Sequence, residues 1–219
     1  MTFPSDIYIY STLRQRMVAE QLRGRGISDE RVLDAMARVP RHAFAPERFR
    51  DQAYEDHPLP IGEGQTISQP YIVALMLQVL AVASSDKVLE VGTGSGYVTA
   101  LLGELAASVF SIERHAVLAD SARERLGAMG YQNIRIVVGD GSRGFAEAAR
   151  YDAIIVSAAA RELPLKLVEQ LADGGRLILP VGSGEAQQLQ LIRKRNGEAR
   201  IFPREMCRFV PLIADDNEL

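Results

Sequence analysis

The residues with the clearest chemical potential form a glycine-rich turn at positions 90–97, which reads Glu-Val-Gly-Thr-Gly-Ser-Gly-Tyr. An apolar run precedes this turn and helix-forming residues follow it, as expected where a strand passes into a helix. Glycines at such a position let a ligand approach the backbone closely. About 20 residues further on, Glu113 closes the next apolar run, where an acid can accept hydrogen bonds from both hydroxyls of a ribose. Together these features predict an adenosine-containing ligand.

The spacing of the glycines indicates which adenosine cofactor is bound. Dinucleotide-binding turns follow the pattern Gly-x-Gly-x-x-Gly and leave a helix N-terminus free for a pyrophosphate. In Gly92, Gly94 and Gly96 the third glycine comes one residue early. Glu90 adds a carboxylate beside the turn, which disfavours a pyrophosphate and suits an ammonium group. S-adenosyl-L-methionine carries an ammonium group and no phosphate. It is therefore the predicted cofactor, with S-adenosyl-L-homocysteine as the product and no metal.

Four more residues extend the predicted cofactor site. Thr93 and Ser95 lie within the glycine turn, although a serine there can also cap the following helix. Asp140 and Gly141 follow the third apolar run. An ionised Asp140 can accept a hydrogen bond from the exocyclic amine of an adenine. Because aspartate beside glycine is also a common turn pair, a purely structural Asp140 stays open as an alternative.

A doubly wound, Rossmann-like α/β sheet must position these residues. Short apolar runs alternate with helix-length segments, which is typical of parallel strands buried on both faces. The ligand-binding residues then lie at the carboxyl ends of successive strands. Two later runs have no helix between them and predict an antiparallel pair at the C-terminal edge. The predicted strands are residues 87–91, 109–112, 134–138, 153–156 and 176–179, followed by the pair 188–192 and 208–212.

The N-terminal part reads as helices joined to the sheet through a long loop. Residues 11–24 and 28–39 are predicted helices, the second with a polar cap and an end before Pro40. Residues 41–70 hold four of the ten prolines and predict a long loop, a kind that is usually functional or disordered. A third helix begins near Pro70 and is apolar on nearly every side, which predicts deep burial.

Composition narrows the class of protein. With 219 residues, 47% of them hydrophobic, the chain is large enough for a buried core, and disorder is disfavoured. A net charge of −3 gives no global reason to bind nucleic acid or an anionic membrane. The single cysteine, Cys207, allows no internal disulfide and no thiolate zinc site. Residues 1–10 do not read as a signal peptide, so we expect a cytoplasmic protein. We also expect a monomer. Residues 1–85 are predicted to pack on a cofactor-binding domain, 86–219, as one unit.

The sequence resembles the protein-L-isoaspartate O-methyltransferase family over nearly the whole chain. The glycine motif is shared by many methyltransferases, whereas residues 65–70 together with 209–212 are specific to this family. The resemblance implies transfer of a methyl group from S-adenosyl-L-methionine to the α-carboxyl of L-isoaspartyl residues in damaged proteins and peptides, a repair reaction. The motifs that carry it are residues 59–71, 90–97, 139–141, 151–156, 174–182 and 208–212.

The resemblance also implies roles for single residues. Ser68 takes the position of the active-site serine, Glu113 that of the ribose acid, and Asp140 with Gly141 that of the adenine contacts. Val210 matches a segment that lines the substrate site. From the chemistry of methyl transfer we further expect Thr66, Ile67 and Gln69 to shape a lid beside Ser68. From the residues alone, Ser68 can equally cap the helix that begins near Pro70.

Four rival functions are weighed against this interpretation. An N-methyltransferase would show Asp or Asn followed by two prolines and an aromatic residue, where this chain has only small residues at 157–160. A nicotinamide dehydrogenase is opposed by the early third glycine and by Glu90. An O-methyltransferase of another carboxylate or hydroxyl substrate stays open. So does a non-catalytic adenosine-binding module, although that would not need the loop that carries Ser68.

Overall fold

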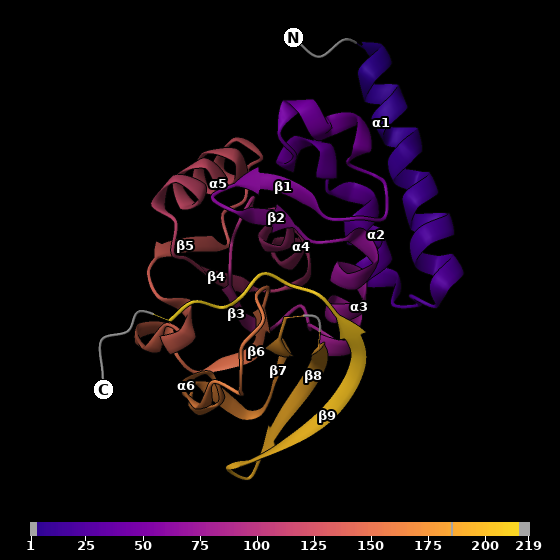
Figure 1. The fold of residues 1–219 in the computed structure, drawn as a ribbon. Coiled ribbons are helices and arrows are strands. Elements are labelled where there is room, and N and C mark those ends of the chain that lie inside the picture. Colours follow the sequence, from indigo (N-terminus) through magenta and orange to yellow (C-terminus); the bar gives the residue numbers. More distant parts are fainter. Residues whose placement is uncertain (1–3, 185, 215–219) are drawn as a thin grey trace.

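The computed structural model describes residues 4–184 and 186–214. In this part of the chain, seven strands form one sheet in the order β5-β4-β3-β6-β7-β8-β9, and β1 and β2 form a separate hairpin (Figure 1). Strands β3 to β7 pair in parallel, whereas β8 and β9 are antiparallel. The predicted doubly wound sheet with an antiparallel edge is therefore confirmed. The strands are β1 Leu59–Gly62, β2 Gln65–Ile67, β3 Lys87–Val91, β4 Ser108–Glu113, β5 Ile134–Val138, β6 Tyr151–Val156, β7 Leu171–Ser183, β8 Ala186–Arg195 and β9 Glu198–Cys207.

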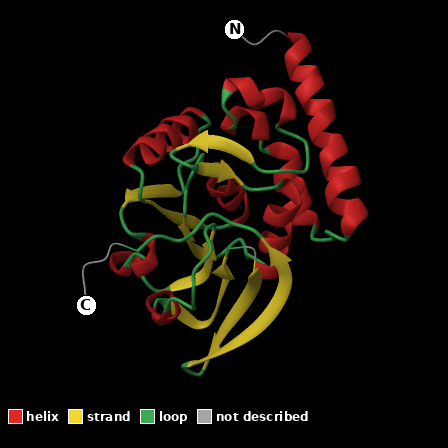
Figure 2. Ribbon diagram, viewed as in Figure 1, coloured by secondary structure: helices red, strands yellow, loops and turns green. Residues whose placement is uncertain are grey.

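Helices flank the sheet (Figure 2). The first begins earlier than predicted, at Pro4, and continues beyond Arg16 into a π-helical stretch, Met17–Leu22. The second has its predicted cap, because the side chain of Asp29 accepts a hydrogen bond from the backbone N–H of Arg31 at 3.0 Å. Within the described ranges, none of the helices combines the length and apolar character needed to cross a bilayer. The α-helices are α1 Pro4–Arg16, α2 Glu30–Arg38, α3 Pro70–Leu80, α4 Tyr97–Leu105, α5 Ala116–Ala128 and α6 Leu165–Glu169.

The central strands are buried on both faces, as their continuous apolar runs predict. Val88 and Ile155 belong to one apolar cluster, and their neighbours Leu89 and Ile154 belong to a second cluster. The first cluster includes residues of α2, α3 and α4 and of the segment that follows α1. Residues on both sides of position 85 therefore share one core, and apolar side chains pack on both faces of the central strands.

The last strand lies earlier in the chain than predicted. β9 is Glu198–Cys207, and residues 208–212 are not a strand. Asn196 and Gly197 have φ values of 52° and 80°, as a two-residue turn between antiparallel strands requires. β9 is almost wholly exposed and contains Pro203, which is tolerated only because this is an edge strand. It therefore lacks the apolar pattern that identifies a buried strand.

Residues 208–214 instead cross the end of β6, as the yellow segment after β9 shows (Figure 1). The N–H of Ala159 donates to the carbonyl of Val210, and the N–H of Leu212 donates to the carbonyl of Ala159, both at 2.8 Å. The side-chain amide of Gln187 binds both backbone groups of Phe209, at 2.6 and 3.1 Å. These contacts hold the segment over the carboxyl edge of the sheet.

The predicted long loop contains the β1–β2 hairpin and two short 3₁₀ turns. The tip of the hairpin is Gly62, Glu63 and Gly64, all with positive φ. Ile61 on β1 reaches the glycine turn, because a Cβ added to Gly94 would lie 3.3 Å from Ile61 Cδ1. The hairpin therefore packs on the turn at the end of β3.

Candidate active site

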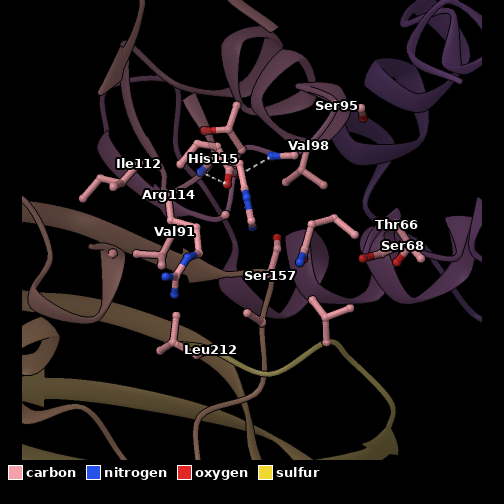
Figure 3. Close-up of a pocket in the computed structure, with 18 of the residues that line it drawn as sticks. Thr66, Ser68, Val91, Ser95, Val98, Ile112, Arg114, His115, Ser157 and Leu212 are labelled. Atoms are coloured by element: carbon pink, nitrogen blue, oxygen red, sulfur yellow. Dashed lines mark hydrogen bonds between the residues drawn. The ribbon is translucent and has the colours of Figure 1, made fainter. Parts of the chain in front are cut away.

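A cavity lies between the carboxyl ends of β3, β4 and β6 and the hairpin, and we name it the first cavity (Figure 3). Thr66 and Ser68 lie on one side of it, Arg114 and His115 on another, and Ser157 between them. Parallel sheets commonly bind ligands at this edge. Ten of the predicted site residues line it: Thr66, Ile67, Ser68, Gly92, Thr93, Gly94, Ser95, Glu113, Gly141 and Val210.

Three N–H groups of the glycine turn already donate hydrogen bonds to other groups of the protein. Gly92 N–H donates to the carbonyl of Ile112 and Gly96 N–H to the carbonyl of Thr93, both at 2.8 Å. Gly94 N–H donates to Glu113 Oε2, also at 2.8 Å. A pyrophosphate site needs such N–H groups pointing at the ligand. This turn therefore suits a ligand without phosphate, as its glycine spacing predicts.

Two of the glycines are required for different reasons. Gly94 lines the cavity with a φ of 53°, which residues with a side chain rarely adopt, and a Cβ there would make a tight contact with Ile61 of the hairpin. Gly96 is not in the cavity wall, although its place in the motif predicts a cofactor contact. It precedes α4 with a φ of 88°, and a Cβ there would lie 3.2 Å from Ala122 on α5. Its observed role is close packing of the two helices.

Glu113 is the acid best placed to bind a ligand. It ends β4, lines the first cavity and is 5% exposed. Oε2 accepts the N–H of Gly94 at 2.8 Å, and Oε1 accepts the N–H of His115 at 2.9 Å (Figure 3). Each carboxylate oxygen can accept a further hydrogen bond. Two backbone groups thus orient a carboxylate that retains acceptor capacity toward the cavity.

The structure places Glu90 differently from the prediction. Its side chain is fully buried and is not in the wall of the first cavity. Oε2 accepts hydrogen bonds from the hydroxyls of Thr99 and Ser111, both at 2.6 Å, while Oε1 has no partner among the described residues. Side chains alternate along a strand, so Val91 faces the cavity and Glu90 faces α4. Glu90 therefore lies beneath the glycine turn and does not present a carboxylate to an ammonium group here.

Glu90 should make the stability of the protein depend on pH. Burial raises the pKa of its carboxyl to about 8, despite the hydrogen bonds from Ser111 and Thr99 that lower it. Between the ordinary value of about 4.5 and this value, the folded protein holds a proton that the unfolded chain releases. The free energy of unfolding should thus decrease as the pH rises from about 5 to 8, by at most about 1.4 kcal/mol per pH unit.

We expect Glu90→Gln to flatten this dependence, because glutamine stays neutral throughout the range. Urea unfolding at several pH values measures the effect. Glu124→Gln, at an exposed position on α5, is the matched control and should keep the wild-type slope. Equal slopes for Glu90→Gln and the wild type would show that Glu90 is ionised in the folded protein.

Asp140 and Gly141 have different positions relative to the first cavity. Gly141 lines it, and a Cβ at this glycine would lie 2.4 Å from Val91 Cγ1. Asp140 is not in the wall; its Oδ1 accepts the N–H of Ser142 at 2.9 Å, and its Oδ2 lies 3.7 Å from Arg143 Nε. The contact with Ser142 supports the structural alternative for Asp140, and the adenine contact stays a prediction.

A second cavity adjoins the first. It lies beside α3 and the segment that follows β9, and its wall includes Arg25, Gln69, Tyr71, Met206 and Phe209. Thr66, Ser68, Ser157 and Val210 line both cavities. The two cavities therefore meet at these four residues, two of which carry hydroxyl groups next to the hairpin and one of which, Ser157, follows β6.

Ser68 does not cap α3. The N-cap position belongs to Gln69, whose side chain makes no capping hydrogen bond. The Ser68 hydroxyl makes no hydrogen bond to any residue in the described ranges. The capping alternative is thus wrong, and the hydroxyl is available to a ligand at the junction of the two cavities.

Several lining residues were not predicted. Ser157, Arg114 and His115 directly follow β6 or β4, so the rule that ligands bind at the carboxyl ends of strands could have found them. His115 Nδ1 lies 3.7 Å from Glu63 Oε2 at the hairpin tip. Arg114 donates to the carbonyl of Ile213 at 3.1 Å. These contacts link the cavity wall to the hairpin and to the C-terminal segment.

His57 and Cys207 offer little chemistry to a ligand. His57 bonds the carbonyl of Pro58 and the carboxylate of Glu55, which raise its pKa, and it lines neither cavity. Cys207 lines the second cavity, but burial raises the pKa of its thiol to about 11, so it stays protonated at neutral pH. In residues 4–184 and 186–214, no cluster of three or more His, Cys, Asp and Glu side chains could hold a metal ion.

The first cavity fits an adenosyl group linked to an amino acid. Glu113 offers oriented acceptors for hydroxyl groups, and the apolar side chains of Val91, Ile112 and Leu212 offer surfaces for a flat ring. The glycine turn allows close approach without offering a phosphate site.

Comparison with known proteins identifies the family. The profile of the protein-L-isoaspartate(D-aspartate) O-methyltransferase family matches residues 13–217. A protein-L-isoaspartate O-methyltransferase from Koribacter versatilis is 54% identical over 217 residues, which cover 99% of this chain and 98% of the relative. One from Methanoculleus marisnigri is 56% identical over 200 residues, or 91% of each chain.

A solved structure has the same fold. It is named as a protein-L-isoaspartate O-methyltransferase from Plasmodium falciparum in complex with S-adenosyl-L-homocysteine, and it is 29% identical with a TM-score of 0.81. The match covers 92% of this chain and 99% of that chain. By sequence and by fold, the chain belongs to the protein-L-isoaspartate O-methyltransferase family.

Proposed function

We propose that this protein transfers a methyl group from S-adenosyl-L-methionine to the α-carboxyl of L-isoaspartyl residues in damaged proteins and peptides. Family membership supports this activity, and the P. falciparum relative was solved with S-adenosyl-L-homocysteine. The observation that carries the proposal is the junction of the two cavities at Thr66, Ser68, Ser157 and Val210. A cofactor in the first cavity and a peptide in the second would meet there.

The reaction needs orientation more than it needs a base. When bound, S-adenosyl-L-methionine supplies a methyl group on a positively charged sulfur. A peptide α-carboxyl has an ordinary pKa of about 3.3–3.7, so the substrate arrives ionised at neutral pH. Among the described residues, no histidine lines the second cavity, and none is needed to remove a proton. Correct placement of two reactants can by itself contribute about 7–11 kcal/mol.

Ser68 provides this orientation in our proposal. Its free hydroxyl donates a hydrogen bond to one oxygen of the substrate carboxylate and directs the other oxygen toward the first cavity. Thr66, Ile67 and Val210 shape the passage between the cavities. Gln69 lines only the second cavity, where it contacts the peptide. Bound cofactor and peptide would displace water from the junction, which favours a reaction in which opposite charges cancel.

Glu113 and the glycine turn hold the cofactor in this proposal. Glu113 accepts hydrogen bonds from the ribose hydroxyls, while the turn at Gly92 and Gly94 contacts the amino acid portion through its backbone. Gly141 lies close to Val91 in the wall of the first cavity, and in this proposal the adenine ring packs there.

The decisive experiment uses methyl-labelled S-adenosyl-L-methionine and two peptides that differ only in one aspartyl or isoaspartyl linkage. We expect base-labile methyl esters on the isoaspartyl peptide and not on the normal one. Equal labelling of both peptides would point to a general carboxyl methyltransferase. The absence of labelling on either, with cofactor binding intact, would contradict the proposed substrate.

A further inference from the structure

The second cavity depends on a residue that is not part of its wall. Arg25 ends the short 3₁₀ stretch after the π-helical segment, whereas Gln69 and Tyr71 lie together at the start of α3, and all three line this cavity. Each of them binds the carboxylate of Asp56, which precedes the hairpin and lines neither the first cavity nor the second. One largely buried acid therefore connects two parts of the cavity wall, the start of α3 and the segment that carries Arg25.

The contacts of Asp56 use both carboxylate oxygens. Oδ1 accepts the backbone N–H of Tyr71 at 3.1 Å. Oδ2 accepts the side-chain amide of Gln69 at 2.8 Å and an N–H of Arg25. The Gln69 amide also donates to the backbone carbonyl of Asp56 at 3.0 Å. The Asp56 side chain is 20% exposed, so these bonds are largely shielded from water.

Asp56 replaces the missing cap of α3. Gln69, at the N-cap position, does not cap the helix through its side chain, and Pro70 at the start of the helix has no N–H. The first N–H of the helix is that of Tyr71, and Asp56 accepts it. A negative charge is also favourable at a helix N-terminus. The start of α3, directly after Ser68, is thus held from outside the helix.

Arg25 completes the cluster. Its guanidinium pairs with Asp56 and lies 3.6 Å from the centroid of the Tyr71 ring. The Arg25 side chain is 45% exposed and lines the second cavity. Asp56 therefore both fixes this cation over Tyr71 and neutralises it beside the bound peptide.

We infer that Asp56 is a positioning residue for the methyl transfer: it fixes the Ser68 segment and the Arg25–Tyr71 wall against the substrate, without touching the substrate itself. The inference rests on the proposed function. It requires that loss of Asp56 lower the turnover of the peptide. Cofactor binding should stay unchanged, because the wall of the first cavity contains none of the three residues that bind Asp56.

The test compares Asp56→Ala, Asp56→Asn and Asp56→Glu with the wild type. A displacement of about 1 Å in a reacting group can cost about 100-fold in rate. For Asp56→Ala we expect kcat for the isoaspartyl peptide to fall about 10- to 100-fold and KM to rise. Asp56→Asn keeps an acceptor for Tyr71 but loses the charge that faces Arg25, so it should be intermediate, and Asp56→Glu should recover part of the activity.

Calorimetric titration with S-adenosyl-L-homocysteine should give the wild-type Kd for every variant and thereby show that each is folded. Glu55→Gln is the matched control, because this neighbouring carboxylate contacts His57 and lies outside both cavities. It should keep the wild-type kcat and KM.

Three results would overturn the inference while the proposed function stands. They are wild-type kinetics in Asp56→Ala, a loss of cofactor affinity in proportion to the loss of turnover, or an equal effect from Glu55→Gln. If Asp56→Ala fails to fold, wild-type kinetics in Asp56→Asn would overturn the inference in the same way. An inactive wild-type protein would instead contradict the proposed function.

Discussion

Replacement of Ser68 by alanine is expected to lower kcat for an isoaspartyl peptide by about 10- to 100-fold. A hydrogen bond to a charged group contributes about 1.5–3 kcal/mol, and about 1.4 kcal/mol corresponds to a tenfold change in rate. The Ser68 hydroxyl makes no hydrogen bond to a described residue and does not cap α3. Its loss should therefore leave the free energy of unfolding and the Kd of the cofactor at their wild-type values.

The measurements are initial rates at saturating S-adenosyl-L-methionine, calorimetric titration with S-adenosyl-L-homocysteine, and urea unfolding. Ser85→Ala, at an exposed position in the turn before β3, serves as the control for the loss of one hydroxyl. If Ser68→Ala turned over the peptide at the wild-type rate, the serine would have no part in orienting the carboxylate. A parallel fall in cofactor affinity would place its role in the first cavity.

The second large effect is expected from Glu113→Ala, which should weaken cofactor binding by about 100-fold or more. Two effects combine. The ligand loses hydrogen bonds to a charged acceptor, each worth about 1.5–3 kcal/mol, and the glycine turn loses the hydrogen bond from Gly94 to Glu113. Glu113 holds the N–H groups of Gly94 and His115 in the wild-type protein. Glu113→Gln retains one acceptor oxygen and should fall between the alanine variant and the wild type.

Calorimetric titration with S-adenosyl-L-methionine and with S-adenosyl-L-homocysteine checks this prediction. Glu147→Ala, which removes an exposed carboxylate outside both cavities, should bind as the wild type does. An unchanged Kd in Glu113→Ala would remove the ribose role from this residue. The cofactor's adenosine would then have to lie elsewhere.

The order of strands and helices could be predicted because its signals are local. A strand buried on both faces is mostly apolar, and the apolar residues of β3, β4 and β6 made these strands recognisable. β9 was not predicted at its true position, because an exposed edge strand needs no apolar face and so lacks an apolar pattern. The turn signal at Asn196 and Gly197 was present and would have placed the strand correctly.

The candidate site was predictable to the extent that it follows strand ends. Glu113 and Gly92 were located by that rule and line the first cavity. Glu90 was expected at the ligand, yet it is buried between β4 and α4, since a side chain near a strand end can face either side of the sheet. The two acids differ in which face of the sheet their side chains occupy. Glu90 points to the face that is covered by α4, whereas Glu113 points to the first cavity.

By itself, the sequence determined the fold class, the glycine turn and the family, because apolar periodicity, turn chemistry and contiguous motifs are all properties of neighbouring residues. Only the tertiary structure decided that the hairpin and the segment after β9 bring Ser68 and Val210 to one junction. It also decided that Asp56 restrains Arg25, Gln69 and Tyr71. Such contacts join side chains that are distant in the chain, and they exist only once the packed core has fixed the separation between the backbones that carry them.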